Sequence, residues 1–443
     1  MKVVGLITEY NPFHNGHKYH IDEARRITGA DYVVIVMSGN FVQRGAPAMI
    51  DKYSRAVMAL ENGADIVLEI PVCYATGSAE YFALGTVSLL NKLGIIDYLC
   101  FGSESGDISI LKEAAQFLTN VPASFDQQLT SYLKQGLSYP AARAKVVGDY
   151  FRKTQTHDNH DSKIADILSE PNNILGIEYL KALHKLSSDI IPVTIQRKSA
   201  HYHALDLTEQ TPSNVVAEAL FSLDVTTAGN PTISSATAIR RAILNADNVF
   251  GLSKLRNSVP NSVFQLLTNN YYKTYPVTEE DFSEIIKYKL LSEDKTSLVS
   301  YVDVSTDLAD RMMNLKDLNK CISEIVKDLK TKNMTHTRIM RALTHMILNI
   351  DQETFYSYNQ SGYTAYARVL GMKRDSSHLL REIKRREGIP VITKVTDAKK
   401  QLDPLGMQML KNDIFATHIY NQTVYKKFGT TIMNEYKYGI CII

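Results

Sequence analysis

The first twenty residues place two histidines at the turn between a buried strand and a helix. Val3–Ile7 is a short apolar run rich in β-branched residues, which is typical of a buried strand. An Asn-Pro pair at 11–12 ends the strand, His-Asn-Gly-His follows at 14–17, and from Ile21 onward apolar residues recur at helical spacing. Because a helix N-terminus exposes unpaired N–H groups and the positive end of its dipole, this turn predicts a phosphate-binding site.

The residue types at this turn suit phosphate chemistry. Gly16 lacks the Cβ that would keep a nucleotide away from the backbone. His14 and His17 can donate hydrogen bonds to phosphate oxygens that gain charge as a phosphoanhydride breaks. The alternative is that both histidines only cap or pack at the turn, and their position after the first strand of an α/β chain favours the phosphate interpretation. The turn is not a Walker loop, because no Gly-x-x-x-x-Gly-Lys-Ser/Thr sequence lies near it.

Strand-like and helix-like segments alternate through the first half of the chain. Further apolar strands are expected at 31–37, 65–70, 95–101 and 192–197, and the helices between them at 51–62, 78–93 and 107–119. This alternation predicts an α/β fold with a Rossmann-like parallel sheet covered by helices on both faces. The glycine-bounded loop 38–45 follows the second strand and should lie at the same edge of the sheet as the histidines.

Past about residue 250 the alternation fades and helical patterns dominate. We therefore expect two domains, a nucleotidyltransferase domain at 1–248 and a mainly helical C-terminal domain at 249–443. Residues 331–390 carry ten Lys and Arg against five Asp and Glu, with Phe355, Tyr356, Tyr358, Tyr363 and Tyr366 among them. Cations with interleaved aromatics suit RNA backbones and unstacked bases, so this segment is a candidate RNA-binding surface. For residues 381–386, a solvated helix face is an equally good interpretation.

Composition limits the class of protein. The net charge of +2 excludes a uniformly basic surface, and the four scattered cysteines contain no Cys-x-x-Cys pair that would suggest a zinc site. No secretory signal and no apolar run long enough to span a membrane is visible. A cytoplasmic location is the simplest expectation.

A second motif lies at 233–241. Ser234 or Ser235 would cap a helix that carries Arg240, which again directs donors toward phosphate. The segment is similar to the Ile-Ser-Ser-Thr-x-x-Arg motif of nucleotidyltransferases, with Ala236 as a one-residue departure that leaves open which hydroxyl contacts phosphate. Taken alone, Asn172 could be part of a plain helix cap, and Arg197 at a strand end could be surface charge.

Taken together, these motifs resemble one family over nearly the whole chain, the bacterial tRNA(Met) cytidine acetate ligases of the His-x-Gly-His nucleotidyltransferase superfamily. The segments that carry the resemblance are Glu9–His17 (EYNPFHNGH), Met37–Gly45 (MSGNFVQRG), Phe101–Glu104 (FGSE), Pro171–Gly176 (PNNILG), Ser235–Arg240 (SATAIR) and Gly362–Arg368 (GYTAYAR).

The resemblance implies an AMP-forming ligase. ATP and acetate would form acetyl-adenylate and pyrophosphate, and N4 of the wobble cytidine (position 34) of elongator tRNA(Met) would then take the acetyl group. Mg²⁺ is expected with ATP, although no protein ligand for a metal can be named. His14 and His17 are the candidate catalytic residues, and a small acetate pocket is expected near 38–44.

The ATP contacts that the resemblance implies, together with the second motif, give one candidate nucleotide-binding set. It consists of Ile7, Thr8, Glu9, Tyr10, Asn11, Pro12, Phe13, His14, Asn15, Gly16, His17, Lys18, Tyr19, His20, Gly102, Asn172, Arg197, Ser235 and Arg240.

Two other functions stay open from the residues alone. One is a small-molecule adenylyltransferase of the same fold, making a dinucleotide or CoA precursor, which would not need the basic second half. The other is a non-catalytic RNA-binding protein that senses a nucleotide.

Overall fold

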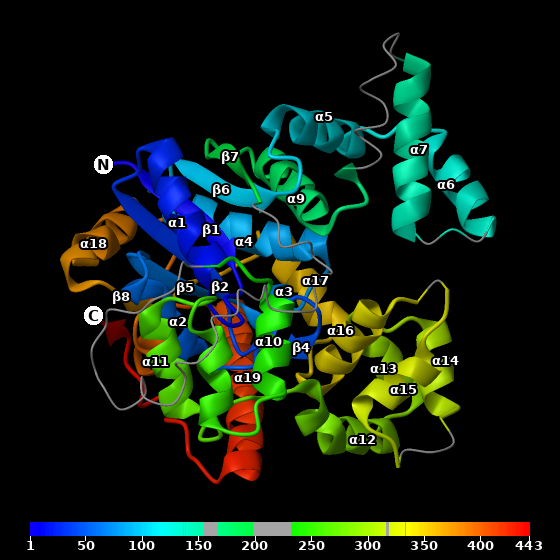
Figure 1. Ribbon diagram of the computed structural model, residues 1–443. Coiled ribbons are helices and arrows are strands. Elements are labelled where there is room, and N and C mark those ends of the chain that lie inside the picture. Colours follow the sequence, from blue (N-terminus) through cyan, green and yellow to red (C-terminus); the bar gives the residue numbers. More distant parts are fainter. Residues whose placement is uncertain (136, 138, 155–166, 198–231, 316–318, 333) are drawn as a thin grey trace, which may run out of the picture.

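A sheet of eight strands runs through the centre of the molecule, with helices packed on both of its faces (Figure 1). The computed structural model describes all residues except 136, 138, 155–166, 198–231, 316–318 and 333. Side chains of the second strand alternate between two separate hydrophobic cores, with Val34 and Val36 in one and Val33, Ile35 and Met37 in the other. A strand that is buried on both faces needs this continuous apolar run, which is why the sequence pattern predicts it.

The strands are β1 (Val3–Thr8), β2 (Tyr32–Ser38), β3 (Phe41–Val42), β4 (Ala46–Pro47), β5 (Ile66–Ile70), β6 (Tyr98–Ser103), β7 (Ile191–Gln196), β8 (Ala367–Met372), β9 (Val391–Ile392) and β10 (Cys441–Ile442). The main sheet has the order β10-β8-β5-β2-β1-β6-β7, with β9 also paired to β8, and β3 and β4 form a separate hairpin. From β5 to β7 all neighbours are parallel. The chain builds outward from β1 to β5 and then returns to β6 on the other side, so the strand order reverses beside β1, where open α/β sheets bind ligands.

The helices of the first part of the chain are α1 (Asn15–Thr28), α2 (Lys52–Glu61), α3 (Val72–Ala75), α4 (Ala79–Leu93), α5 (Ile108–Thr119), α6 (Phe125–Lys134), α7 (Tyr139–Thr154), α9 (Pro171–Lys185) and α10 (Ala236–Leu244). Those of the second part are α11 (Asn261–Asn270), α12 (Ser283–Ser292), α13 (Lys295–Ser300), α14 (Thr306–Met313), α15 (Ile322–Leu329), α16 (His336–Ile347), α17 (Gln352–Gln360), α18 (Ser377–Arg386) and α19 (Pro404–Phe428). Among the described residues, none of these helices is long and apolar enough to cross a membrane.

The predicted parallel sheet is confirmed, and the C-terminal half adds strands to it that the sequence did not reveal. β8 pairs antiparallel with β5, with Glu69 opposite Arg368, and β9 and β10 pair with β8. Hydrogen-bonded sheet therefore continues across the expected boundary at 248, although the second part is mainly helical. The division into 1–248 and 249–443 stays a prediction.

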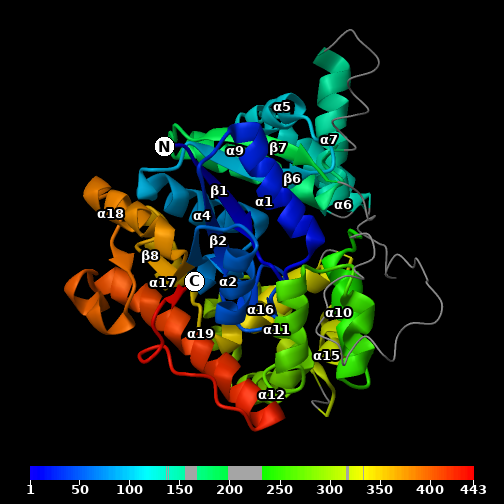
Figure 2. The same cartoon turned by 60° about the vertical axis from the view of Figure 1, so that its left-hand side comes forward.

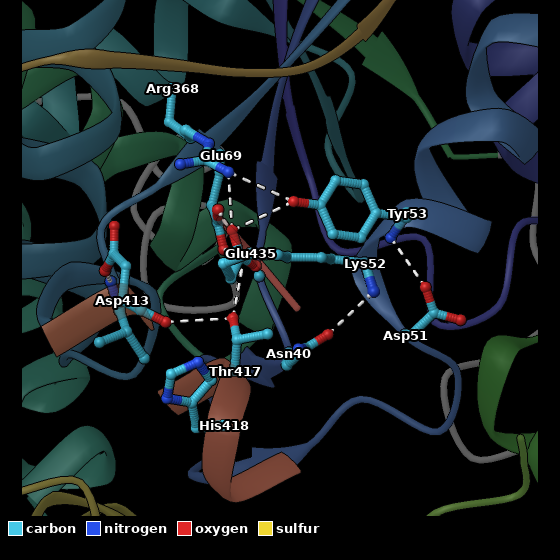
Figure 3. A network of polar contacts seen from close by, with 12 residues as sticks. Asn40, Asp51, Lys52, Tyr53, Glu69, Arg368, Asp413, Thr417, His418 and Glu435 are labelled. Atoms are coloured by element: carbon cyan, nitrogen blue, oxygen red, sulfur yellow. Dashed lines mark hydrogen bonds and ion pairs between the residues drawn. The ribbon is translucent and has the colours of Figure 1, made fainter. Parts of the chain in front are cut away.

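A buried polar network ties the C-terminal segment to the sheet (Figure 3). Lys52 Nζ lies 2.8 Å from both carboxylate oxygens of Glu69 and 2.6 Å from Glu435 Oε1, and the three side chains are almost completely buried. The other oxygen of Glu435 accepts a 2.7 Å hydrogen bond from Arg368 Nη2. Burial acts to raise the pKa of Glu435, but the charges of Lys52 and Arg368 outweigh it and lower that pKa to about 2. These contacts join α2, β5, β8 and the segment after α19.

Candidate active site

A cavity of ≈ 1070 Å³ opens at the C-terminal ends of β1, β6 and β7. The β3–β4 hairpin and the N-terminal residues of α9, α10 and α16 complete its walls. Most of the candidate nucleotide-binding set lines it, namely Ile7, Thr8, Glu9, Tyr10, Asn11, His14, Gly16, His17, Tyr19, His20, Gly102, Asn172, Arg197, Ser235 and Arg240. Two motifs more than two hundred residues apart in sequence thus meet in one cavity.

Four residues of that set lie outside the cavity lining. Phe13 is fully buried and packs edge-on against Tyr10, with ring centroids 4.7 Å apart, and Pro12 precedes it. Asn15 Nδ2 donates to the carbonyls of Thr232 (2.9 Å) and Asn257 (2.7 Å), which fastens the histidine turn to the segment before α10. Lys18 forms a surface ion pair with Asp22. Their assignment to the nucleotide-binding set stays a prediction.

His14 and His17 form the N-terminal cap of α1. His14 Nδ1 accepts from the backbone N–H of Gly16 (3.1 Å), and His17 Nδ1 accepts from the backbone N–H of His14 (3.3 Å). The two rings stack with centroids 3.7 Å apart. The capping interpretation and the phosphate interpretation are therefore compatible, because each ring uses Nδ1 for the cap and leaves Nε2 available for a phosphate.

The histidines at this turn are neutral at physiological pH. Burial, together with the charges of Arg197 and Arg240, lowers the pKa of His14 to about 3. Burial and the neighbouring His14 lower the pKa of His17 well below its ordinary value, and burial with Arg197 lowers that of His20 to about 4. A neutral imidazole whose Nδ1 accepts a hydrogen bond carries its proton on Nε2. Each of His14 and His17 can therefore offer an Nε2–H donor to a phosphate oxygen.

Gly16 serves this arrangement for a reason that the sequence did not indicate. A Cβ on Gly16 would lie 2.9 Å from Cε1 and 3.0 Å from Nδ1 of His14. The missing side chain thus makes room for the His14 ring, and the close approach of a nucleotide to this backbone stays a prediction.

Gly16→Ala should therefore reduce catalysis without unfolding the protein. Alanine is the better helix residue by up to about 1 kcal/mol, whereas displacement of a catalytic ring by about 1 Å can cost about 10²-fold in rate. Urea unfolding and ATP–pyrophosphate exchange would measure the two effects separately. Gly439→Ala, where an added Cβ meets nothing within 4 Å, is the matched control. Full exchange activity in Gly16→Ala would show that the position of His14 does not matter.

On the adjoining wall, Asn172 links Arg197 to Glu104. Asn172 Nδ2 donates to Glu104 Oε1 (2.5 Å), and Asn172 Oδ1 accepts from Arg197 Nη1 (3.1 Å). The other oxygen of Glu104 accepts from the backbone N–H of Asn173 (2.9 Å), at the N-terminus of α9. A Cβ on Gly102 would lie 3.3 Å from Cγ of Arg197, so this glycine gives the arginine stem its space. The sequence signalled Asn172 and Arg197 but did not reveal Glu104 as the acceptor that orients Asn172.

The second motif supplies the opposite wall. Ser235 is the N-cap of α10, and its hydroxyl accepts from the backbone N–H of Ala238 (3.1 Å). Arg240 donates from Nη1 to the carbonyl of Asn11 (2.9 Å) and from Nη2 to Thr237 Oγ1 (3.2 Å). The one-residue departure at Ala236 thus places Thr237 under the guanidinium, while Ser235 caps the helix.

Arg55 holds the ends of β1 and β2 together beneath the cavity, a role that the sequence did not indicate. Its side chain is completely buried and donates to the carbonyls of Ile50 (2.9 Å), Glu9 (2.5 Å), Ser38 (3.0 Å) and Gly39. Burial lowers the pKa of its guanidinium. Nothing in the local helical pattern of α2 distinguishes this arginine from an exposed one, so only the fold reveals its function.

The β3–β4 hairpin forms a further wall and is seated on α16. A Cβ on Gly45 would collide with the backbone of Met340 and Arg341, and the carbonyl of Gly45 accepts from Thr344 Oγ1 (2.7 Å). Val42, Gln43, Arg44 and Ala46 line the cavity together with His336, Thr337 and Met340. The loop was expected here, but the contribution of α16 was not, because it comes from nearly three hundred residues further along the chain.

The predicted RNA-binding character of residues 331–390 is wrong for most of its aromatics. Phe355, Tyr358, Tyr363 and Tyr366 are buried in the hydrophobic core, and of the five only Tyr356 is exposed. Arg368 belongs to the buried network and Arg341 pairs with Asp303. These aromatic side chains pack in the hydrophobic core, so counting them along the sequence overestimates the surface available to a nucleic acid.

No protein-only metal site is visible in the part of the chain that the structure describes, where no three His, Cys, Asp or Glu side chains form a group that could hold a metal ion. Four glutamates of the described chain line the cavity, Glu9, Glu104, Glu170 and Glu279. Glu104 accepts from Asn172 and Asn173, and Glu9 accepts from the backbone N–H of Gln43 (3.0 Å). Such a site fits Mg²⁺ only if phosphate oxygens supply most of its ligands, as is usual for ATP-bound magnesium.

Comparison with known proteins decides the family. A family model described as HIGH Nucleotidyl Transferase matches residues 1–219 and 222–435. The tRNA(Met) cytidine acetate ligase of Acetivibrio thermocellus is 38% identical over 421 residues, covering 95% of this chain and 94% of that protein. The chain belongs to the tRNA(Met) cytidine acetate ligase family.

Other matches agree. The tRNA(Met) cytidine acetate ligase of Halothermothrix orenii is 37% identical over 426 residues, covering 95% of this chain and 94% of that protein. The crystal structure of Thermotoga maritima TmcAL bound with alpha-thio ATP has a TM-score of 0.84 at 28% identity and full coverage of both chains. The apo structure of that protein has a TM-score of 0.86 at 28% identity, also with full coverage. The resemblance to the tRNA(Met) cytidine acetate ligase family and the predicted fold class are thus confirmed.

Proposed function

We propose that this chain is an ATP-dependent ligase that acetylates N4 of the wobble cytidine of elongator tRNA(Met) in the cavity described above. One observation carries the proposal, the stacked neutral pair His14–His17 at the N-terminus of α1, with the charges of Arg197 and Arg240 close enough to lower the pKa of His14. A relative named tRNA(Met) cytidine acetate ligase matches 95% of the chain, and a similar solved structure is bound with alpha-thio ATP.

In the first step, a carboxylate oxygen of acetate attacks the α-phosphorus of ATP, the bond to the bridging oxygen breaks, and pyrophosphate leaves. The Nε2–H groups of His14 and His17 donate hydrogen bonds to the phosphate oxygens that gain charge. Because both imidazoles are neutral, they do this without transferring a proton to the phosphate. Arg240, held by Asn11 and Thr237, binds the outer phosphates with Ser235. Arg197 and Gly102 lie on the adenosine side, where Asn172 orients the guanidinium.

We place acetate beside the β3–β4 hairpin. Val42 and Ala46 face each other across the hairpin, and Met340 of α16 adjoins it, so together they offer a small apolar surface next to Arg44. In the second step, the cytidine N4 attacks the acetyl carbon, AMP leaves, and the nitrogen loses a proton. The base must leave the anticodon stack to reach this point. Mg²⁺ would accompany the phosphates and neutralise part of their charge.

The direct test is mass spectrometry of elongator tRNA(Met) after incubation with the protein, ATP and isotope-labelled acetate. We expect one labelled acetyl group on the wobble cytidine, with one AMP and one pyrophosphate formed for each acetyl transferred. Pyrophosphate release that needs a phosphorylated small molecule instead of acetate would point to the small-molecule adenylyltransferase. Tight tRNA binding without any ATP turnover would point to the non-catalytic protein.

A further inference from the structure

Five exposed cations lie on or just before helix α18 at the edge of the molecule. Arg374 lies just before α18, and Arg381, Lys384, Arg385 and Arg386 lie on it. Three acids, Asp375, Glu382 and Glu387, lie in the same segment, so the cations are in excess. We call these five cations the α18 patch. Lys384, Arg385 and Arg386 fall in the last helical turn, where the helix dipole favours them, but Arg374 and Arg381 do not.

The α18 patch lies at the edge of the sheet where the parallel strands begin. The backbone N–H of Lys373 donates to the carbonyl of Asp65, directly before β5. The ring of His378 contacts that of Tyr32, the first residue of β2, with centroids 5.0 Å apart. At the other end of α18, the side chain of Arg386 packs against Gly94, which precedes β6. In Figures 1 and 2, α18 lies on the side of the molecule away from α10 and α16.

The cavity lies at the opposite edge, where the same strands end. β2 is seven residues long and runs from Tyr32, beside α18, to Ser38, before the hairpin. At about 3.3 Å per residue, the patch and the cavity are therefore roughly 20 Å apart along the strands. A nucleotide whose base enters the cavity cannot also contact α18, and neither can its immediate neighbours, since successive phosphates of a helical strand advance only about 3.4 Å along the helix axis.

From this separation we infer that the α18 patch is a second tRNA contact, which binds the phosphate backbone of the tRNA body away from the anticodon. The inference rests on the proposed function, which supplies the RNA. Residues 373–387 contain no Phe, Tyr or Trp, and arginines and lysines without interleaved aromatics suit a phosphate backbone rather than unstacked bases. The ion pair of Arg385 with Glu382 is solvent-exposed and weak enough to be exchanged for a phosphate. The patch would add affinity and orient the tRNA, while base recognition takes place at the cavity.

The experiment compares two RNAs with one variant. Arg381→Ala, Lys384→Ala and Arg385→Ala are combined, and Kd is measured over a range of salt for full-length elongator tRNA(Met) and for a pentanucleotide centred on its wobble cytidine. For the full tRNA we expect affinity to fall on the order of tenfold, and the slope of log Kd against log salt to fall by about two to three. For the pentanucleotide we expect no change, because it extends only two nucleotides either way from the base in the cavity and cannot reach the patch.

The double variant Arg381→Lys with Arg385→Lys keeps the charge and should bind both RNAs like the unmodified protein. Acetate-dependent ATP–pyrophosphate exchange should be unchanged in both variants. An unchanged affinity of the alanine variant for full tRNA would overturn the inference, and so would an equal loss with the pentanucleotide. The proposed function fails separately, if the unmodified protein transfers no acetyl group to tRNA.

Discussion

Lys52→Met should lower the free energy of unfolding by about 3–5 kcal/mol, because it leaves Glu69 and Glu435 facing each other in the core with too little positive charge. Lys52 is 1% exposed, so water cannot replace the lost ammonium. Total stabilities of about 5–15 kcal/mol are typical, so a loss of this size is a large fraction of the whole. Urea unfolding followed by circular dichroism would measure it.

Charge balance, rather than the loss of one contact, is the cause to be tested. In the double variant Lys52→Met with Glu69→Gln, the remaining carboxylate of Glu435 keeps its partner Arg368, and much of the lost stability should return. Lys295→Met removes a lysine from a half-exposed pair with Asp310 and should cost less than about 1 kcal/mol. If the double variant were less stable than Lys52→Met alone, the charge-balance explanation would be wrong.

His17→Asn should lower kcat for adenylate formation by about 10²–10³-fold while the protein stays folded. The shorter amide keeps an acceptor oxygen for the backbone N–H of His14 but has no group at the position of Nε2. Loss of one donor that strengthens in the transition state has an effect of this size in other enzymes. Acetate-dependent ATP–pyrophosphate exchange would give the rate, and thermal unfolding would check the fold.

His17→Gln carries an amide nitrogen closer to the Nε2 position, so it should retain more activity than His17→Asn. His184→Ala, at an exposed position in the last turn of α9, should leave the rate unchanged. Because burial keeps the pKa of His14 at about 3 and that of His17 well below its ordinary value, the rate should show no histidine inflection between about pH 5 and 8. A rate in His17→Asn equal to that of the unmodified protein would remove His17 from the mechanism.

The parts of the fold that the sequence predicted depend on local patterns. β1 and β2 contain long apolar runs of strand length, and β5 is an apolar run interrupted only by Glu69. The rule that parallel strands end at one edge brings Arg197 to the histidine turn. β8 escaped prediction because nothing in Ala367–Met372 shows that it pairs antiparallel with a strand three hundred residues earlier.

Within the site, the side chains that we propose as ATP contacts were easier to predict than those that support them. The turn at 14–17 and Ser235–Arg240 have recognisable spacing. Arg55 and Glu104 act through backbone carbonyls and side-chain amides that only the folded chain brings within reach. The aromatics at 355–366 were misassigned because burial is a tertiary property, whereas the cations beside them are visible in the sequence.

A crystal structure of this protein with a non-hydrolysable ATP analogue and acetate tests the central claim most directly. We expect the α-phosphate within hydrogen-bonding distance of Nε2 of His14 and His17, the outer phosphates against Ser235 and Arg240, and the adenosine beside Gly102 and Arg197. Phosphates bound elsewhere, with both imidazoles left in contact with protein or water alone, would contradict it.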